Sequence, residues 1–124
     1  MSMDPVAGLA AARDRAMEVR ALYEQLERHL NRDVWTHHEL LLGLVNDVGT
    51  VGRLTLARDG TWNADGDINS QLEHKLSEVL WWVMVIAERL DIDIATAFAA
   101  TMNEIEGGLA AAVQRIPAGE AAAD

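Results

Sequence analysis

Apolar residues recur along most of this chain at intervals of three and four residues, which is the spacing of one face of an α-helix. The first such stretch follows Asp4, a suitable N-cap, and Pro5, which suits the first helical position. The apolar stripe then continues to Leu30 through Leu9, Ala12, Ala16, Val19, Leu22, Tyr23 and Leu26. This pattern predicts a first helix over about 5–30.

A second stripe follows the segment NRDVW. Thr36 can cap a helix there, and Glu39 stands three residues later, which is the spacing of a capping box. Apolar positions then continue to about Ala57, at Leu40, Leu41, Leu44, Val45, Val48, Val51, Leu54 and Leu56. The predicted helix contains Gly49 and Gly52, although each glycine costs about 1 kcal/mol relative to alanine in a helix. We interpret them as places where another helix, or a phosphate group, comes close.

The segment RDGTWNADGDINS is rich in Gly, Asp, Asn and Ser, and it predicts a loop. Asp67 or Ser70 can cap a third helix that continues to about Arg89. Its apolar positions are Leu72, Leu76, Val79, Leu80, Val83, Ile86, Ala87 and Leu90. Beyond Trp81 this helix is apolar almost all round, so we expect that half to be buried on more than one side.

A fourth helix is predicted to begin at Ile94, after an acidic break at 91–93. Its apolar positions include Ala97, Phe98, Met102 and Ile105, and we expect Gly107 and Gly108 to weaken or end it. The last residues, 117–124, read PAGEAAAD and are predicted to be a disordered tail. The chain is therefore predicted to be all-α, with one helical domain over 1–116 and helices two and three as a central antiparallel pair.

Composition narrows the class of protein. The 124 residues carry a formal net charge of -10 and scattered basic residues, so duplex nucleic acid is not an expected partner. The most apolar run, VLWWVMVIA, is too short to span a bilayer, and we expect no signal peptide and no membrane partner. The chain has no cysteine, which fits a cytoplasmic location. A domain of this size buries about two-thirds of its unfolded surface, which favours self-association.

Polar residues gather on two of the predicted helices. The second helix presents Glu39, Asn46, Asp47, Thr50 and Arg53, and the third presents His74, Lys75 and Glu78. Acids at three-residue spacing on facing helices are a common way for helical bundles to hold hard divalent cations. Adjacent histidines such as His37 and His38 point about 100° apart on a helix and are not expected to chelate one metal together.

The run LLGLVNDVGTVGRL, followed across a loop by LEHKLSEVLWWVMVIAERLDIDIATAF, resembles the MazG-like group of all-α nucleoside triphosphate pyrophosphohydrolases. Those proteins carry the motifs E-E-x-G-E-L and E-L-A-D-V-L-W, closed by a turn of the type R-L-G-I-D. The resemblance covers about Trp35 to Glu106. It implies a four-helix bundle completed by oligomerisation, as a homodimer or tetramer. It also implies Mg²⁺ ions that bind the triphosphate and activate water, releasing pyrophosphate and a nucleoside monophosphate.

Aligned with this resemblance, the two metal motifs fall on 47–50 and 75–78. Only their outer acids, Asp47 and Glu78, remain as metal ligands and catalytic groups. Thr50 and Lys75 stand where the family has acids, and Asn46 replaces an accessory acid. Two unit charges about 4 Å apart interact by about 4 kcal/mol at an effective dielectric constant near 20, so a lysine at the metal position opposes Mg²⁺ binding. We therefore expect the ammonium group of Lys75 to lie between Asp47 and Glu78 as a surrogate cation.

Three functions remain open from the sequence. The first is a MazG-like homologue with an eroded Mg²⁺ site that still binds a nucleotide or a partner. The second is an active pyrophosphohydrolase whose reduced site adds Glu39 or Glu73, and the third is a structural module in which Asp47 and Glu78 are solvated surface acids. Candidate nucleotide contacts are Trp35, Glu39, Asn46, Thr50, His74 and Lys75, whereas Trp62 and Trp35 are alternatively loop anchors. Trp81 and Trp82 are predicted to lie in the core or in a subunit interface.

Overall fold

The computed structural model describes residues 5–118, and in that range it contains four α-helices and no strand. Helix α1 covers Pro5–His29, α2 covers His37–Arg58, α3 covers Ile68–Arg89 and α4 covers Ile94–Gln114. The prediction of an all-α fold is confirmed. The predicted cap at Asp4, and residues 119–124 of the predicted tail, lie outside the described residues.

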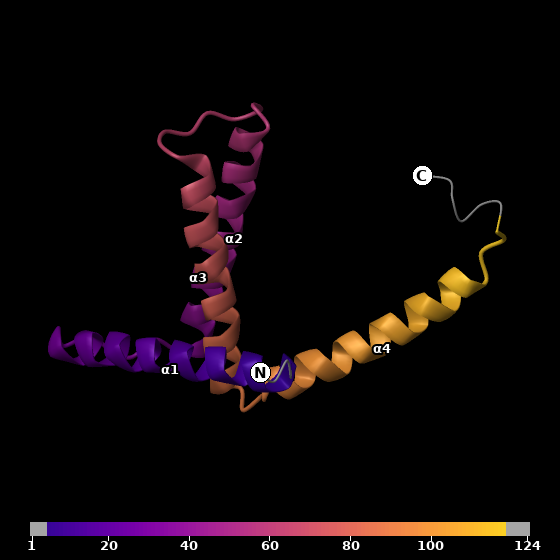
Figure 1. The fold of residues 1–124 in the computed structure, drawn as a ribbon. Helices are drawn as coiled ribbons and strands as arrows, with labels where there is room; N and C mark the ends of the chain where they lie inside the picture. Colours follow the sequence, from indigo (N-terminus) through magenta and orange to yellow (C-terminus); the bar gives the residue numbers. More distant parts are fainter. Residues whose placement is uncertain (1–4, 119–124) are drawn as a thin grey trace.

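The four helices are arranged as a hairpin with two arms (Figure 1). α2 and α3 run antiparallel and side by side, as predicted for helices two and three. α1 lies across the end of the hairpin at which α3 finishes, and α4 leaves from the same end and extends away from the pair. α4 contacts the rest of the chain mainly through α1.

Polar side chains set the helix ends. Thr36 and Glu39 form the predicted capping box, in which the Glu39 N–H donates to Thr36 Oγ1 and the Thr36 N–H donates to Glu39 Oε1, at 3.3 and 3.1 Å. Asp67 is the N-cap of α3, because its carboxylate accepts from the backbone N–H of Ser70. That hydrogen bond lowers the pKa of Asp67 below its usual value. α2 ends where Gly60 adopts a φ of 83°, a conformation that favours glycine.

Of the two effects expected of Gly107 and Gly108, weakening or ending the fourth helix, the second is wrong, because α4 continues to Gln114. The residues that follow the two glycines are Leu109, three alanines and Val113. Leucine and alanine are among the strongest helix formers, and they offset the unfavourable propensity of the glycines.

The core is small and follows the α2–α3 hairpin and its contacts with α1 and α4. Its members are Ala16, Leu40, Leu54, Leu72, Met84, Val85, Ala87 and Ala95. The burial of Met84, Val85 and Ala87 agrees with the apolar character of α3 beyond Trp81. Two charged residues, Arg20 and Asp47, are buried as well, at 6% and 5% exposure. Buried charges require oppositely charged or hydrogen-bonding partners, so a polar cluster is expected around each of these two residues.

Much apolar surface stays exposed on all four helices. The chain exposes 9357 Å², whereas a compact folded chain of 13.6 kDa exposes about 6,600 Å². Every described residue from Ala100 onward is exposed, including Met102, Ile105 and Leu109 of α4. Within the described range, α2 is the one helix whose length and composition would also fit a membrane span. The single chain therefore leaves a large apolar surface unburied.

Candidate functional site

The only lysine in the sequence, Lys75, lies between two carboxylates on the inner side of the hairpin. Its Nζ is 3.5 Å from Oδ1 of Asp47 on α2 and 3.2 Å from Oε1 of Glu78 on α3. This is the position predicted for the ammonium group. The hydrogen bond to Glu78 raises the pKa of Lys75 above its usual value, and the charge of Asp47 adds to that effect against the partial burial of the group.

Asp47 is not a solvated surface acid. It is 5% exposed, and three groups donate hydrogen bonds to its two oxygens. The indole Nε1 of Trp82 donates to Oδ2 at 2.8 Å, while Asn46 Nδ2 and Lys75 Nζ lie 3.4 and 3.5 Å from Oδ1. Nε2 of His74 lies 2.8 Å from Oε1 of Glu78. Both acids are thus engaged by protein donors.

Trp82 reaches Asp47 because α2 has a glycine one turn earlier, at Gly43. A Cβ added at Gly43 would lie 2.6 Å from Cη2 of the Trp82 ring, closer than any carbon contact allows. By contrast, a Cβ added at Gly49 or Gly52 would meet nothing within 4 Å. Gly43 is therefore the glycine that permits close packing inside the hairpin, and Gly49 and Gly52 have no such role within one chain.

An aromatic cavity of about 460 Å³ lies beside this cluster, between α1 and α3. Four aromatic rings form a continuous wall around it. Tyr23 contacts Trp81 at a centroid distance of 5.4 Å, Trp81 meets Trp82 edge-on at 4.9 Å, and Trp35 stacks on Trp82 at 5.9 Å. His74, Ser77 and Glu78 of α3 line the cavity together with these rings. The predicted contact residue Trp35 and the predicted acid Glu78 thus share one cavity.

The contribution of α1 to this cavity was not predicted. Val19, Arg20, Tyr23 and Glu27 line it from that side. Arg20 NH2 and NH1 donate to the two oxygens of Glu27 at 3.2 and 3.4 Å, and its Nε donates to Glu24 at 3.2 Å. The signal available in the sequence was an arginine inside the apolar stripe with acids four and seven residues later, which places all three on one helix face.

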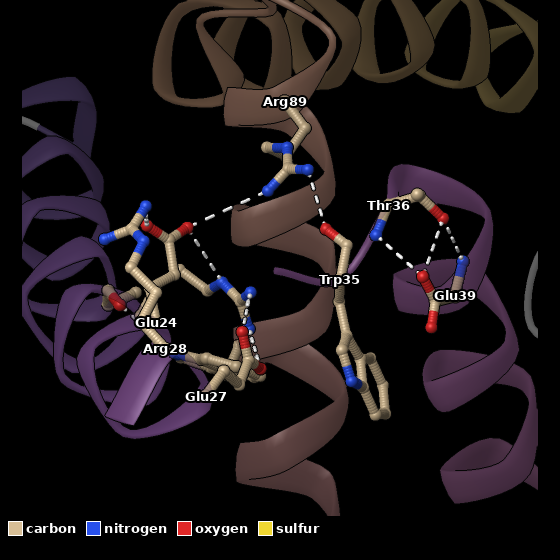
Figure 2. Close-up of polar contacts among 10 residues, drawn as sticks. Glu24, Glu27, Arg28, Trp35, Thr36, Glu39 and Arg89 are labelled. Atoms are coloured by element: carbon tan, nitrogen blue, oxygen red, sulfur yellow. Dashed lines mark hydrogen bonds and ion pairs between the residues drawn. The ribbon is translucent and has the colours of Figure 1, made fainter. Parts of the chain in front are cut away.

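Arg89 holds the segment between α1 and α2 against this wall (Figure 2). Its NH2 donates to the backbone carbonyl of Trp35 at 2.6 Å, and its NH1 lies 3.8 Å from Oε1 of Glu24. In Figure 2 Arg89 extends from α3 with Trp35 on one side and Glu24 on the other. The arginine therefore fixes the position of Trp35, and with it one wall of the cavity.

The remaining predicted residues lie at different distances from this cavity. Thr50, His74 and Lys75 border a second cavity of about 240 Å³ on the other side of the lysine. Thr50 Oγ1 donates to the Asn46 carbonyl at 3.2 Å, so it is engaged with its own helix. Glu39 is occupied by the capping box and lines neither cavity. Trp62 also lines neither cavity, and it is 55% exposed in the loop before α3.

The donor set does not suit Mg²⁺. A magnesium ion takes oxygen ligands in a near-octahedral arrangement, and here the ammonium group occupies the space between the two acids. In the described part of the chain, no group of three or more His, Asp or Glu side chains is placed to hold a metal ion. The cavity beside the two acids can instead hold a ring that is neutral, or that carries hydrogen-bond donors, stacked on its aromatic side chains.

Comparisons of this chain with protein-family models, with curated proteins and with solved structures find no match.

Proposed function

We propose that this protein is a MazG-like helical module that binds the base of a nucleotide without Mg²⁺ and does not hydrolyse it. One observation carries the proposal, namely that Lys75 lies within salt-bridge distance of both Asp47 and Glu78. In the family that the sequence resembles, these two acids would hold the metal that activates water. An ammonium group occupies the space between them and offsets one of their two charges, so the site is poorly suited to recruit that ion.

The cavity supports a base as the recognised part of the ligand. Its volume of about 460 Å³ lies within the range of small-molecule sites, and its aromatic walls suit stacking. The charges favour hydrogen-bond donors, because the carboxylates of Glu27 and Glu78 outnumber Arg20 among the lining residues. Arg20 and Lys75 are each paired with two acids, so neither offers an uncompensated charge to a triphosphate. A nucleoside or nucleoside monophosphate fits this balance better than a triphosphate.

Isothermal titration calorimetry with Mg²⁺ and Mn²⁺ tests the metal-free part of the proposal. We expect no binding of millimolar affinity or better by the unmodified protein, and binding by the double variant Thr50→Glu, Lys75→Glu, which restores both acids of the motifs. A phosphate-release assay with added pyrophosphatase, run over canonical and damaged nucleoside triphosphates, should show no activity of the unmodified protein. Tight Mg²⁺ binding, or turnover of any triphosphate in the panel, would contradict the proposal.

Thermal unfolding in EDTA tests the binding of a base. A ligand that binds only the folded state at 100 times its dissociation constant stabilises that state by about 2.7 kcal/mol. We expect nucleosides or nucleoside monophosphates to raise the melting temperature, and Trp35→Leu to remove the effect. Trp62→Leu is the matched control, because Trp62 is an exposed loop tryptophan outside the cavity. If no member of a panel of all common bases shifts the melting temperature, the ligand class is wrong.

Self-association is a second proposed property, and the exposed apolar surface supports it. The exposed area exceeds that of a compact chain of this mass by about 2,800 Å². Two chains covering that excess would bury about 5,600 Å² in total, at the upper end of the range for obligate homodimers. We therefore propose that the helices are completed as a homo-oligomer, either a homodimer or a tetramer.

A further inference from the structure

α2 has a second apolar side, which faces away from α3. We define the outer face of α2 as the set Leu41, Leu42, Val45, Val48, Gly49, Gly52 and Leu56. At 3.6 residues per turn these positions fall within an arc of about 120°, opposite the buried positions Leu40, Asp47 and Leu54. The five large side chains of this face are between 43% and 68% exposed. A single chain therefore leaves this face without a partner.

The two glycines of this face need an explanation outside the single chain. Glycine is a poorer helix residue than alanine, and an added Cβ at either position would meet nothing within 4 Å. Alanine would thus be the better residue at both positions if the face were simply exposed. Small residues on a helix face allow a second helix to approach closely, as Gly43 allows Trp82 to approach on the inner side.

We infer that the outer face of α2 packs against the same face of a second copy of this chain, with Gly49 and Gly52 at the closest approach of the two helices. The inference rests on the proposed self-association and adds to it the surface and the crossing point. The outer face of α2 is one part of the exposed apolar surface, which extends over all four helices. None of the seven residues is charged, so two chains of net charge -10 can meet here without juxtaposing like charges.

A lipid bilayer is the other environment that would cover an apolar helix face. α3 argues against it, because this helix lies alongside α2 and exposes Glu73 and His74 at the level of the α2 midpoint. Charged and polar side chains at that depth are costly in hydrocarbon. A second protein surface that covers only the outer face of α2 leaves these side chains in water.

Sedimentation velocity of the full chain tests the inference, with Gly49→Leu, Gly52→Leu as the disrupting double variant. Gly107→Leu is the matched control, because Gly107 lies on the side of α4 opposite the apolar residues Phe98, Met102, Ile105 and Leu109. We expect the unmodified protein and the control to sediment as an oligomer, and the double variant to dissociate at least 100-fold more readily. Circular dichroism verifies that each variant keeps its helices.

A disulfide measurement keeps the inference testable if the double variant does not fold. The chain has no cysteine, so Gly49→Cys introduces a single thiol. Thiols on two closely approaching helices meet the short Cα–Cα distance that a disulfide needs, and we expect rapid crosslinking of Gly49→Cys and none of Gly107→Cys.

Three results would overturn parts of this picture. A monomeric unmodified protein contradicts the proposed self-association itself. An oligomer that survives Gly49→Leu, Gly52→Leu, and that Gly49→Cys does not crosslink, leaves self-association in place and shows that the interface lies elsewhere. Flotation of the unmodified protein with vesicles of phosphatidylcholine, together with loss of flotation in the double variant, assigns the face to a membrane instead.

Discussion

Two cations flank the aromatic cavity, and each lies between two carboxylates. Arg20 pairs with acids of its own helix, at 3.2 Å from both Glu24 and Glu27. Lys75 pairs with Glu78 of its own helix and with Asp47 of α2. The side chain of Arg20 is 7% exposed, whereas that of Lys75 is 30% exposed. The two clusters have the same charge pattern but differ in burial and in the elements that they join.

The difference separates a pairing within one helix from a pairing that joins two helices. The pairing of Arg20 with Glu24 and Glu27 is set by the geometry of one helix, because residues four and seven positions apart share one face. A guanidinium group also keeps its charge at any accessible pH and binds carboxylates through a planar fork. The Lys75 cluster exists only because two helices meet, and its ammonium group can lose a proton. We therefore expect Arg20 to maintain the fold and Lys75 to determine what the site can bind.

The largest effect is expected from Arg20→Met. The substitution leaves Glu27 partly buried without its cation, and it leaves Glu24 with only the longer contacts to Arg28 and Arg89, at 3.7 and 3.8 Å. Breaking a buried pair in this way costs about 3–5 kcal/mol. The free energy of unfolding, measured by urea denaturation, should fall by that amount. Arg15→Met is the matched control, because the Arg15 side chain is 81% exposed and its pairing with Glu18 is weak. Surface pairs contribute about 0–1 kcal/mol. Equal effects of the two substitutions would show that the Arg20 cluster is not structural.

A smaller loss is expected from Lys75→Met, about 1–3 kcal/mol. Asp47 would lose its cation but would keep the hydrogen bonds from Trp82 and Asn46. The remaining cost comes from a buried carboxylate with no balancing charge. Adding Asp47→Asn to Lys75→Met should recover part of the lost free energy of unfolding, because the side chain at position 47 is then neutral. If the double variant is no more stable than Lys75→Met, the charge of Asp47 is not what Lys75 offsets.

The sequence was sufficient for the features that depend on local spacing. The helix stripes, the Thr36 capping box and the Asp67 cap follow from residues within one turn of each other. The placement of Lys75 between Asp47 and Glu78 was also predicted, from the alignment of these residues with the metal motifs of the family that the sequence resembles. These predictions succeeded because each involves one helix or two consecutive helices.

The features that depend on how α1 crosses the hairpin could not be derived from the sequence. Periodicity shows that Arg20 and Tyr23 share a helix face, but it does not give the direction in which that face crosses α3. For the same reason the sequence does not show which neighbour each glycine of α2 allows to approach. Gly43, Gly49 and Gly52 look alike in the sequence, and only the position of the Trp82 ring distinguishes the first from the others.

The smallest effect is expected at alkaline pH, where the Lys75 cluster should lose its contribution to stability and the Arg20 cluster should keep its own. The pairing with Glu78 and Asp47 raises the folded pKa of Lys75 above its ordinary value of 10.5. Its contribution to stability is therefore fully present below pH 10.5 and is lost as the pH rises through the higher folded pKa. The Arg20 cluster keeps its charge throughout this range, because a guanidinium group stays protonated in proteins.

Because Lys75 is the only lysine in the chain, lysine labelled with ¹⁵N at Nζ gives one side-chain signal whose titration reports this pKa directly. We expect its midpoint above 10.5 in the folded protein and at 10.5 in urea. Lys75→Arg is the control in a parallel series of melting temperatures, because an arginine at this position stays charged. The melting temperature of the unmodified protein should fall more steeply above pH 10.5 than that of Lys75→Arg. Parallel curves, or a folded midpoint at or below the urea value, would show that the two acids do not hold the ammonium group in solution. The hypothesis that Lys75 acts as a surrogate cation would then be wrong.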